Sequence, residues 1–142
     1  MTADADLAAL VPRLADARVL VIGDVMLDRY IYGEVDRISP EAPVPVCRVT
    51  DEAAMLGGAG NVVRNLAALG ASVEFVAAIG RDVAGAEIER LVAELAGVRA
   101  SLVAAAGRAT TVKTRLFAGI QQLLRADREA TEPLSDATVD AI

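Results

Sequence analysis

The stretch GGAGNVVRNLAALG, residues 57–70, combines closely spaced glycines with a helical repeat of apolar side chains. The apolar residues that share one helical face are Val62, Val63, Leu66 and Leu69. Gly70 is suited to ending such a helix, because glycine adopts the left-handed conformation at helix C termini without strain. The pattern therefore predicts a helix that opens from a glycine-rich turn and ends at Gly70.

Apolar segments on either side of this helix indicate strands of one sheet. RVLVIG at 18–23 is a continuous β-branched run, which is typical of a strand buried on both faces. VEFVAAI at 73–79 predicts a second strand and residues 98–104 a third. Because strands alternate with helices, we expect an α/β fold in which helices cover the faces of a parallel sheet.

Three further helices are predicted from spacing and caps. Residues 6–16 show helical spacing, but Pro12 falls inside the pattern and predicts a short or kinked helix. Asp82 is placed to cap a helix that Gly97 ends. Ser135 is placed to cap a last helix close to residue 142.

Two strand pairs interrupt the alternation. Residues 29–34 and 44–50 carry polar positions, and three prolines between and within them favour an excursion over a central strand. We expect this pair to form a flap outside the main sheet. Residues 110–118 and 121–127 read as two strands around Gly119, which predicts a hairpin.

The composition excludes several classes of function. The chain has 142 residues, which suits one domain or part of a larger one, and its net charge of −6 with no run of Lys or Arg argues against nucleic-acid binding. One cysteine, Cys47, and no histidine exclude a disulfide framework, zinc sites built on Cys and His, and histidine-dependent nucleophilic catalysis. No apolar run approaches the ~20 residues of a membrane helix, and the N terminus lacks a basic signal-peptide start, so we expect a cytoplasmic protein without a membrane partner.

The glycine-rich turn is the first candidate binding element. Gly57 and Gly58 allow the backbone to approach a ligand, and amides at a helix start can donate to hydroxyl or phosphate oxygens. Asn61 adds both a donor and an acceptor, which suits a sugar hydroxyl. An ordinary glycine-rich turn explains the same spacing equally well. The segment matches neither a dinucleotide fingerprint nor a P-loop.

Two more groups of polar residues stand out. Asp24 and Asp28 follow the first predicted core strand, where carboxylates can accept hydrogen bonds from sugar hydroxyls. Lys113 and Arg115 are two residues apart on a predicted strand and so share a face, with Gln122 nearby, which suits a phosphate. The alternatives are solvated loop acids in the first case and a solvated charged face in the second.

Four segments together resemble the PfkB/ribokinase family of sugar kinases: VLVIGDVMLDRYIYGEVDRISPEAPVPV (19–46), GGAGNVVRNLAALG (57–70), IGRDVAG (79–85) and TTVKTRLFAGIQQLLRADRE (110–129). The runs RISPEAPVPV and QQLLRAD are similar to the heptose-7-phosphate kinase subgroup. The resemblance implies a ribokinase-like three-layer α/β fold with a parallel central sheet and a small β-strand lid. Residues 1–142 would be its N-terminal, sugar-binding portion, with lid strands at about 29–50.

The resemblance also implies roles for the candidate residues. Asp28 would hold sugar hydroxyls, while Gly57, Gly58 and Asn61 would form the floor of the sugar site. Our charge argument assigns the phosphate of the substrate to Lys113 and Arg115. The lid strands would cover the sugar and pair with those of a second subunit in a homodimer.

The implied activity of the complete enzyme is the ATP-dependent phosphorylation of D-glycero-D-manno-heptose 7-phosphate at its anomeric hydroxyl. The product, the 1,7-bisphosphate, feeds ADP-heptose and lipopolysaccharide core synthesis, and an adenylyltransferase domain is fused to some members. ATP and Mg²⁺ are implied for the full-length enzyme. The Gly-Ala-Gly-Asp motif with the catalytic aspartate and the ATP-binding region do not occur in residues 1–142, so we expect this chain alone to be inactive. Two alternatives stay open, a non-catalytic module for sugar-phosphate binding or dimerisation and a family kinase for another sugar.

Overall fold

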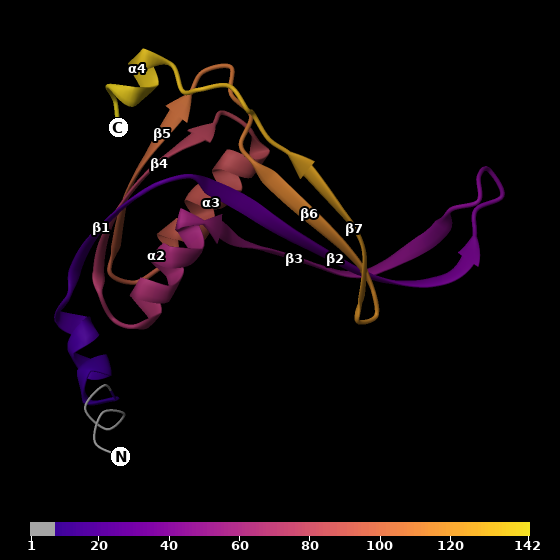
Figure 1. Ribbon diagram of the computed structural model, residues 1–142, viewed down its shortest axis with the longest axis horizontal. Coiled ribbons are helices and arrows are strands. Elements are labelled where there is room, and N and C mark those ends of the chain that lie inside the picture. Colours follow the sequence, from indigo (N-terminus) through magenta and orange to yellow (C-terminus); the bar gives the residue numbers. More distant parts are fainter. Residues whose placement is uncertain (1–7) are drawn as a thin grey trace.

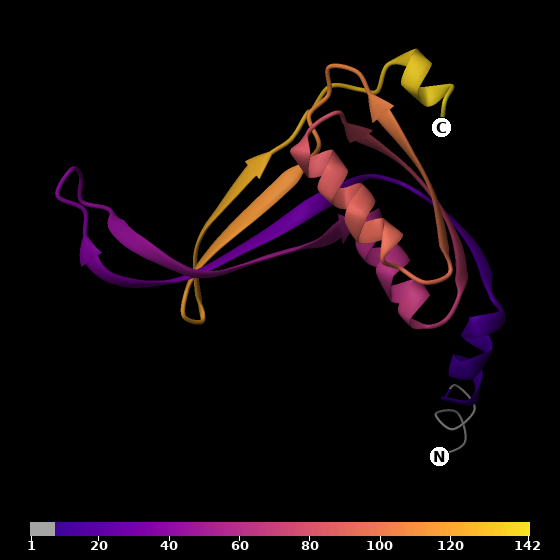
Figure 2. The same ribbon diagram turned by 180° about the vertical axis from the view of Figure 1, so that it is seen from behind.

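The chain forms two β-sheets with helices packed against both, in the computed structural model that describes residues 8–142 (Figure 1). The first sheet is parallel, in the order β1 (Arg18–Ile22), β4 (Ser72–Gly80) and β5 (Val98–Ala105). The second sheet has the order β3 (Pro45–Gly58), β2 (Val25–Ile38), β6 (Val112–Ala118) and β7 (Gln121–Arg128). Figure 2 shows the two sheets from behind, with the second extending to the left of the first. The predicted α/β class with a parallel sheet is confirmed.

The helices are η1 (Val11–Asp16), α2 (Ala59–Ala68), α3 (Val83–Ala93) and the short α4 (Asp136–Val139). They begin where the predicted caps lie and α2 ends before Gly70, but α3 ends at Ala93 and not at Gly97 as predicted. Gly70 has φ = 86° after α2, a conformation that glycine adopts without steric cost. The Asp82 side chain accepts a hydrogen bond from the Gly85 amide, and Ser135 accepts one from the Thr138 amide. These bonds satisfy amides that have no partner within the helix.

A single apolar core joins the two sheets through α2 and α3. Its largest fully buried side chains come from both sheets and both helices: Phe75, Leu27, Ile88, Val63 and Val73. Along β4 the odd-numbered residues face this core and the even-numbered ones face away, as the two-residue period of a strand requires. The second sheet is therefore held against the first by shared hydrophobic burial.

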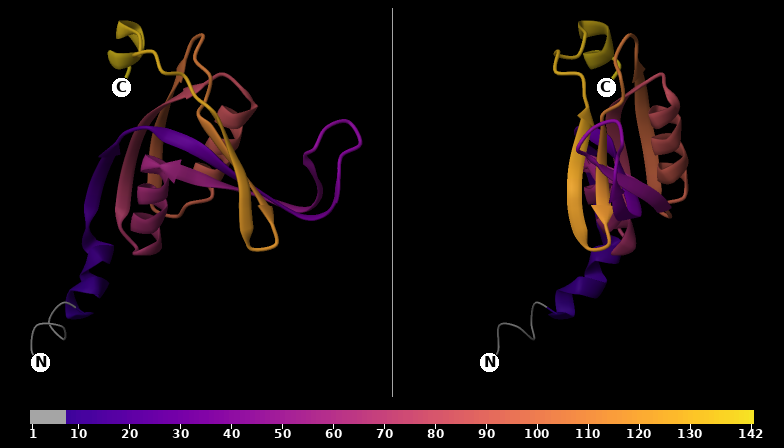
Figure 3. Two further views of the ribbon diagram at one scale, coloured as in Figure 1. Left: turned by 45° about the vertical axis from the view of Figure 1, so that its right-hand side comes forward. Right: turned by 90° about the vertical axis from the view of Figure 1, so that its right-hand side faces the viewer.

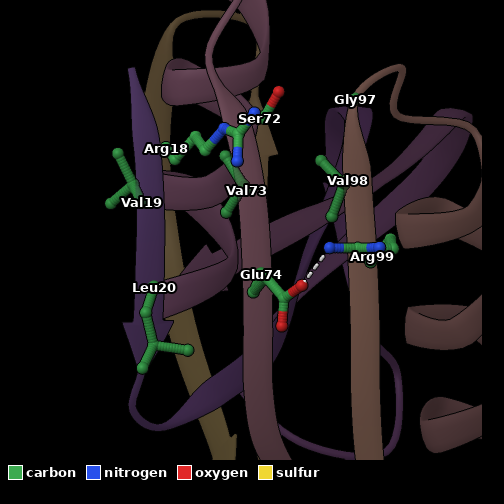
Figure 4. A pocket seen from close by; sticks show the side chains of 9 residues that line it. All are labelled: Arg18, Val19, Leu20, Ser72, Val73, Glu74, Gly97, Val98 and Arg99. Atoms are coloured by element: carbon green, nitrogen blue, oxygen red, sulfur yellow. Dashed lines mark hydrogen bonds and ion pairs between the residues drawn. The ribbon is translucent and has the colours of Figure 1, made fainter.

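The prediction that 18–23 is buried on both faces is wrong. Leu20 and Ile22 keep 60% and 61% of their surface exposed. The physical reason is that α2 and α3 pack on the opposite face of the first sheet, and no segment of residues 8–142 covers the face that carries Leu20. A hollow of about 820 Å³ lies on the first sheet, at the amino ends of its strands (Figure 4).

The predicted flap is a separate sheet, as expected, but its boundaries are wider than 29–50. Its strands begin at Val25 and run to Gly58, so Gly57 and Gly58 end a strand instead of forming only a loop. The hairpin of β6 and β7 joins the same sheet, because β6 pairs parallel with β2 from Leu27 to Gly33. Beyond Gly33 only β2 and β3 continue, as an arm that extends away from the rest of the molecule (Figure 3).

The N-terminal segment is helical only in part. Residues 8–10 are α-helical and continue into η1, which has Pro12 in its first turn, as the predicted short helix requires. Leu10 and Val11 are exposed, so this segment contributes nothing to the core. Residues 6 and 7 of the predicted helix lie outside the described residues. None of the helices in residues 8–142 has the length and apolarity needed to cross a membrane.

Candidate functional site

Asp28 and Gly57 are in direct contact on neighbouring strands. The antiparallel register of β2 and β3 places Gly57 opposite Met26 and Met55 opposite Asp28. A Cβ atom at position 57 would overlap the Oδ2 atom of Asp28, so only glycine leaves room for the carboxylate there. Asp28 is part of a strand and its side chain is only 16% exposed, so it is not the solvated loop acid of the alternative interpretation.

Arg115 fixes the other oxygen of the same carboxylate. Its Nη1 donates to Oδ1 of Asp28 at 2.7 Å, and its guanidinium lies 5.2 Å from the centre of the Tyr30 ring. The side chains of Arg115 and Asp28 are only 21% and 16% exposed, so this ion pair is sheltered from solvent. The hydrogen bond to Asp28 raises the pKa of Arg115 further above its ordinary value.

Lys113 lies beside Asp28 in the register of β2 and β6, but its charge is already compensated. Its Nζ donates to Asp127 at 2.9 Å and to Glu129 at 3.4 Å. The hydrogen bond to Asp127 raises the pKa of Lys113, and the same bond lowers the pKa of Asp127. Lys113 and Arg115 therefore lie on one face, as the spacing predicts, with carboxylate partners already in place.

Asn61 is held near this face through Arg64. The Nη2 of Arg64 donates to Oδ1 of Asn61 at 2.9 Å, and its Nη1 lies 3.6 Å from the sulfur of Met55, the cross-strand neighbour of Asp28. The first amide of α2, that of Ala59, donates to the carbonyl oxygen of Asp24 at 2.9 Å. Gly58 enables this turn with φ = 58°. The start of α2 is thus bound to the start of the β2 strand.

Two polar atoms of this group remain open to a ligand. Asp28 Oδ2 and Asn61 Nδ2 make no hydrogen bond within residues 8–142. No buried side-chain nitrogen or oxygen in that range lacks a partner, so both atoms are in contact with solvent. A carboxylate oxygen accepts hydrogen bonds and an amide nitrogen donates them, and a hydroxyl group can use both. The arrangement therefore suits a polyhydroxylated ligand.

A cavity of about 240 Å³ lies at the carboxyl end of β4, and Lys113 is the only predicted substrate-binding residue in its lining. Its lining includes Asp24, Gly80, Thr110, Lys113 and Glu129. Ligands of open α/β sheets bind at this end of the strands. The hollow of Figure 4 lies at the opposite end of the first sheet and contains none of the predicted site residues.

Gln122 lies away from the other predicted residues. It is exposed on the edge strand β7, opposite Phe117 in the register. Arg64 was missed by the sequence analysis, although it is three residues after Asn61 and so on the same side of a predicted helix.

A hydrogen-bond network around Asp82 positions β6, the strand that carries Lys113 and Arg115. Asp82 accepts from the amides of Gly85 at 2.8 Å and Thr110 at 3.0 Å, and Thr110 Oγ1 accepts from the Gly80 amide at 2.8 Å. Burial acts to raise the pKa of Asp82, but these hydrogen bonds outweigh it and hold the pKa below its ordinary value. This network links the turn before α3 to the residues that lead into β6.

The parallel sheet with a second β-sheet beside it is an arrangement shared with solved carbohydrate kinases. A carbohydrate kinase from Agrobacterium tumefaciens superposes with a TM-score of 0.64 at 24% identity, over 79% of this chain and 35% of that one. Ribokinase from Giardia lamblia superposes with a TM-score of 0.59 at 22% identity, over 87% of this chain and 40% of that one. These likenesses establish the fold.

Residues 16–141 match the pfkB family carbohydrate kinases, and the chain belongs to that family. It is 56% identical over 135 residues to "Bifunctional protein HldE" of Paramagnetospirillum magneticum, covering 93% of this chain and 28% of that protein. It is 59% identical over 117 residues to "D-beta-D-heptose 7-phosphate kinase" of Bordetella bronchiseptica, covering 82% of this chain and 37% of that protein. The chain thus spans between a quarter and two fifths of the length of these relatives.

Proposed function

We propose that this chain is the sugar-binding and lid portion of a heptose-7-phosphate kinase. The complete enzyme transfers a phosphoryl group from ATP to the anomeric hydroxyl of D-glycero-D-manno-heptose 7-phosphate and yields the 1,7-bisphosphate for ADP-heptose and lipopolysaccharide core synthesis. The observation that carries the proposal is the contact of the Asp28 carboxylate with Gly57, beside the helix start that presents Asn61. The names of two relatives at 56% and 59% identity support the choice of sugar.

In this proposal the hydroxyls of the sugar contact the open atoms of the site. Asp28 Oδ2 accepts a hydrogen bond, and Asn61 Nδ2 donates one. Gly57 and Gly58 form the floor because the absence of side chains lets the ligand approach the backbone. The amides at the start of α2 favour electronegative atoms, since the helix dipole is positive there.

Arg115 is the stronger candidate for the phosphate at position 7. A guanidinium carries five N–H donors, of which Asp28 takes only one in this structure, so others remain for phosphate oxygens. Lys113 has three donors and two carboxylate partners, so a phosphate must compete with Asp127 and Glu129 for it. Gln122 would contact the substrate only at the outer edge of the site.

We propose that ATP and Mg²⁺ bind to parts of the enzyme outside residues 8–142. An adenylyltransferase domain fused to the kinase is consistent with the name of the bifunctional relative. The substrates proposed here are metabolites of the cytoplasm, where we place the enzyme.

We further propose that the complete enzyme is a homodimer formed through the arm of the lid. The arm beyond Gly33 is a two-stranded ribbon, which is at best marginally stable on its own in water. It nevertheless exposes four apolar side chains, Val35, Ile38, Val44 and Val49. A second arm packed against them would remove this surface from water.

Purified full-length protein incubated with ATP and candidate sugars tests the proposed activity. We expect phosphorylation of D-glycero-D-manno-heptose 7-phosphate at the anomeric position, detected as the 1,7-bisphosphate by ³¹P NMR. Preference for ribose, fructose 1-phosphate or adenosine would point to a family kinase for another sugar. Tight binding of heptose 7-phosphate without turnover would favour a non-catalytic binding or dimerisation module.

A further inference from the structure

Arg64 is a half-buried cation without an acidic partner. Its two hydrogen-bonding contacts are to Asn61 Oδ1 and the sulfur of Met55, and no Asp or Glu oxygen in residues 8–142 forms an ion pair with it. The missing acidic partner sets Arg64 apart from the other cations near this site, because Lys113 and Arg115 both pair with carboxylates. Each contact of Arg64 is to a residue next to the candidate sugar site.

The chemistry of the guanidinium determines how the Asn61 amide is oriented. Arginine has N–H donors and no acceptor, so only the oxygen of the amide can face it. The NH₂ group of Asn61 must then point away from Arg64, and it makes no hydrogen bond to any described residue. Without Arg64 the amide could rotate by about 180°, since its oxygen and nitrogen ends have nearly the same shape.

The orientation matters because of the carboxylate on the neighbouring strand. Asp28 Oδ2 is an acceptor, so with the oxygen of Asn61 outward these two side chains would offer a hydroxyl two acceptors and no donor. With the NH₂ group outward it offers one acceptor and one donor. Met55 helps to hold Arg64 in place, because its sulfur lies 3.6 Å from Nη1 and it is the register partner of Asp28.

We propose that Arg64 is a positioning residue of the sugar site, which fixes Asn61 so that its amide donates to a substrate hydroxyl. This inference rests on the proposed sugar-binding function. Arg64 need not contact the substrate, and its effect passes through Asn61. The expected signature is a loss of sugar affinity that depends on the presence of Asn61 and leaves ATP binding unchanged.

A double-mutant cycle in the full-length kinase tests the proposal. We expect Arg64→Met and Asn61→Ala each to raise the KM for heptose 7-phosphate by about tenfold, the effect of one lost hydrogen bond of about 1.4 kcal/mol. Arg64→Met introduced into the Asn61→Ala protein should add less than about twofold, because the amide that Arg64 orients is then absent. Arg64→Lys, which keeps a donor, should restore most of the affinity. Arg90→Met, which removes an exposed arginine of α3 paired with Glu87 and Glu94, is the matched control and should leave the KM unchanged.

Three results would overturn the inference. An unchanged sugar KM in Arg64→Met is the first, and a full tenfold effect in the Asn61→Ala background is the second. The third is a loss confined to heptose 7-phosphate, with binding of unphosphorylated heptose unaffected, because that result would mean that Arg64 contacts the phosphate itself. The proposed function is tested separately by wild-type turnover of heptose 7-phosphate. If another sugar is the substrate, the same cycle is measured with that sugar.

Discussion

Arg115 donates a hydrogen bond to Asp28 at 2.7 Å, although 87 positions separate the two residues in the sequence. The contact exists because β6 pairs parallel with β2, which brings the hairpin of residues 112–128 into the sheet that begins next to the first core strand. An acid that follows the first strand and a cation from a late hairpin thus become one sheltered pair. The carboxylate is held in a fixed direction, with Oδ2 left for a ligand.

Gly57→Ala should weaken sugar binding by displacing the Asp28 carboxylate. The added Cβ overlaps Oδ2 of Asp28 and Cγ of Met26, so the Asp28 side chain must shift, which disturbs its hydrogen bond to Arg115. Loss of a charge-assisted hydrogen bond costs about 1.5–3 kcal/mol, and we expect the sugar KM to rise by at least about tenfold. Steady-state kinetics with varied heptose 7-phosphate and saturating ATP measures the effect.

Gly107→Ala is the control for this substitution. Gly107 has φ = 71° and no atom near its missing Cβ, so alanine there strains the backbone without touching the site. We expect a lower melting temperature and an unchanged sugar KM. A similar KM change in both variants would mean that Gly57 acts through general stability.

Arg115→Met should reduce the affinity for phosphorylated and unphosphorylated sugar to different extents. Loss of the hydrogen bond to Asp28 affects both ligands, while loss of the remaining donors affects only the phosphate. We expect heptose 7-phosphate to lose about tenfold more affinity than heptose in isothermal titration calorimetry. Equal losses would mean that Arg115 only holds Asp28 and does not contact the phosphate. Arg99→Met, on the exposed face of the first sheet, is the control and should change neither affinity.

Asp82→Asn should destabilise the protein in a pH-dependent manner. Asparagine has one acceptor oxygen, whereas the two oxygens of Asp82 accept from the Gly85 and Thr110 amides, so one of these amides loses its partner at a cost of about 1–3 kcal/mol. Because the pKa of Asp82 is lower in the folded than in the unfolded protein, its contribution is present above about pH 4 and is lost as the pH falls through the folded pKa. Urea unfolding of both proteins should therefore give a difference at pH 7 that shrinks below pH 4.

Ser135→Ala serves as the comparison for the Asp82 variant. Ser135 also accepts a hydrogen bond from a helix amide, but its helix has only four residues and little burial. We expect a smaller loss of stability than in Asp82→Asn, with no dependence on acid pH. A constant difference between wild type and Asp82→Asn from pH 3 to pH 7 would contradict the role assigned to the carboxylate.

Ile38→Asp should dissociate the proposed dimer. Ile38 is 62% exposed near the end of the lid arm, and a charge there cannot be buried against a second arm without a large desolvation cost. We expect sedimentation velocity to show monomers for this variant and dimers for wild type. Val83→Asp is the matched control, because Val83 is 80% exposed and starts a helix where acidic residues are favourable. Dimers of Ile38→Asp would exclude the arm as the interface.

Local signals in the sequence predicted most of the helix boundaries. Gly70, Asp82 and Ser135 act within a few residues of their own position, so their effects can be read without knowing the tertiary structure. The parallel pairing of β2 with β6 was not predictable in this way, because it joins segments about 85 residues apart through a shared core. The contact of Arg115 with Asp28 follows from that pairing, whereas Lys113 contacts Asp127 through the hairpin of β6 and β7.

Burial of the first strand also could not be read from its own residues. The run RVLVIG has the composition of a strand covered on both faces, yet Leu20 faces away from α2 and α3. The composition of a strand indicates which of its faces are apolar enough to be buried. The arrangement of the helices decides which face is covered within residues 8–142. Arg64 differs, because its spacing from Asn61 would have placed it beside the site once the helix was predicted.

Binding of D-glycero-D-manno-heptose 7-phosphate to full-length wild-type and Asp28→Asn proteins, measured by isothermal titration calorimetry, tests the sugar site most directly. In the variant, the oxygen of the introduced amide must face Arg115, so an NH₂ group replaces the acceptor at the Oδ2 position. We predict a Kd at least about tenfold higher than that of wild type, with unchanged affinity for ATP. Equal Kd values for the sugar phosphate in the two proteins would contradict the assignment of Asp28 and Asn61 to the sugar site.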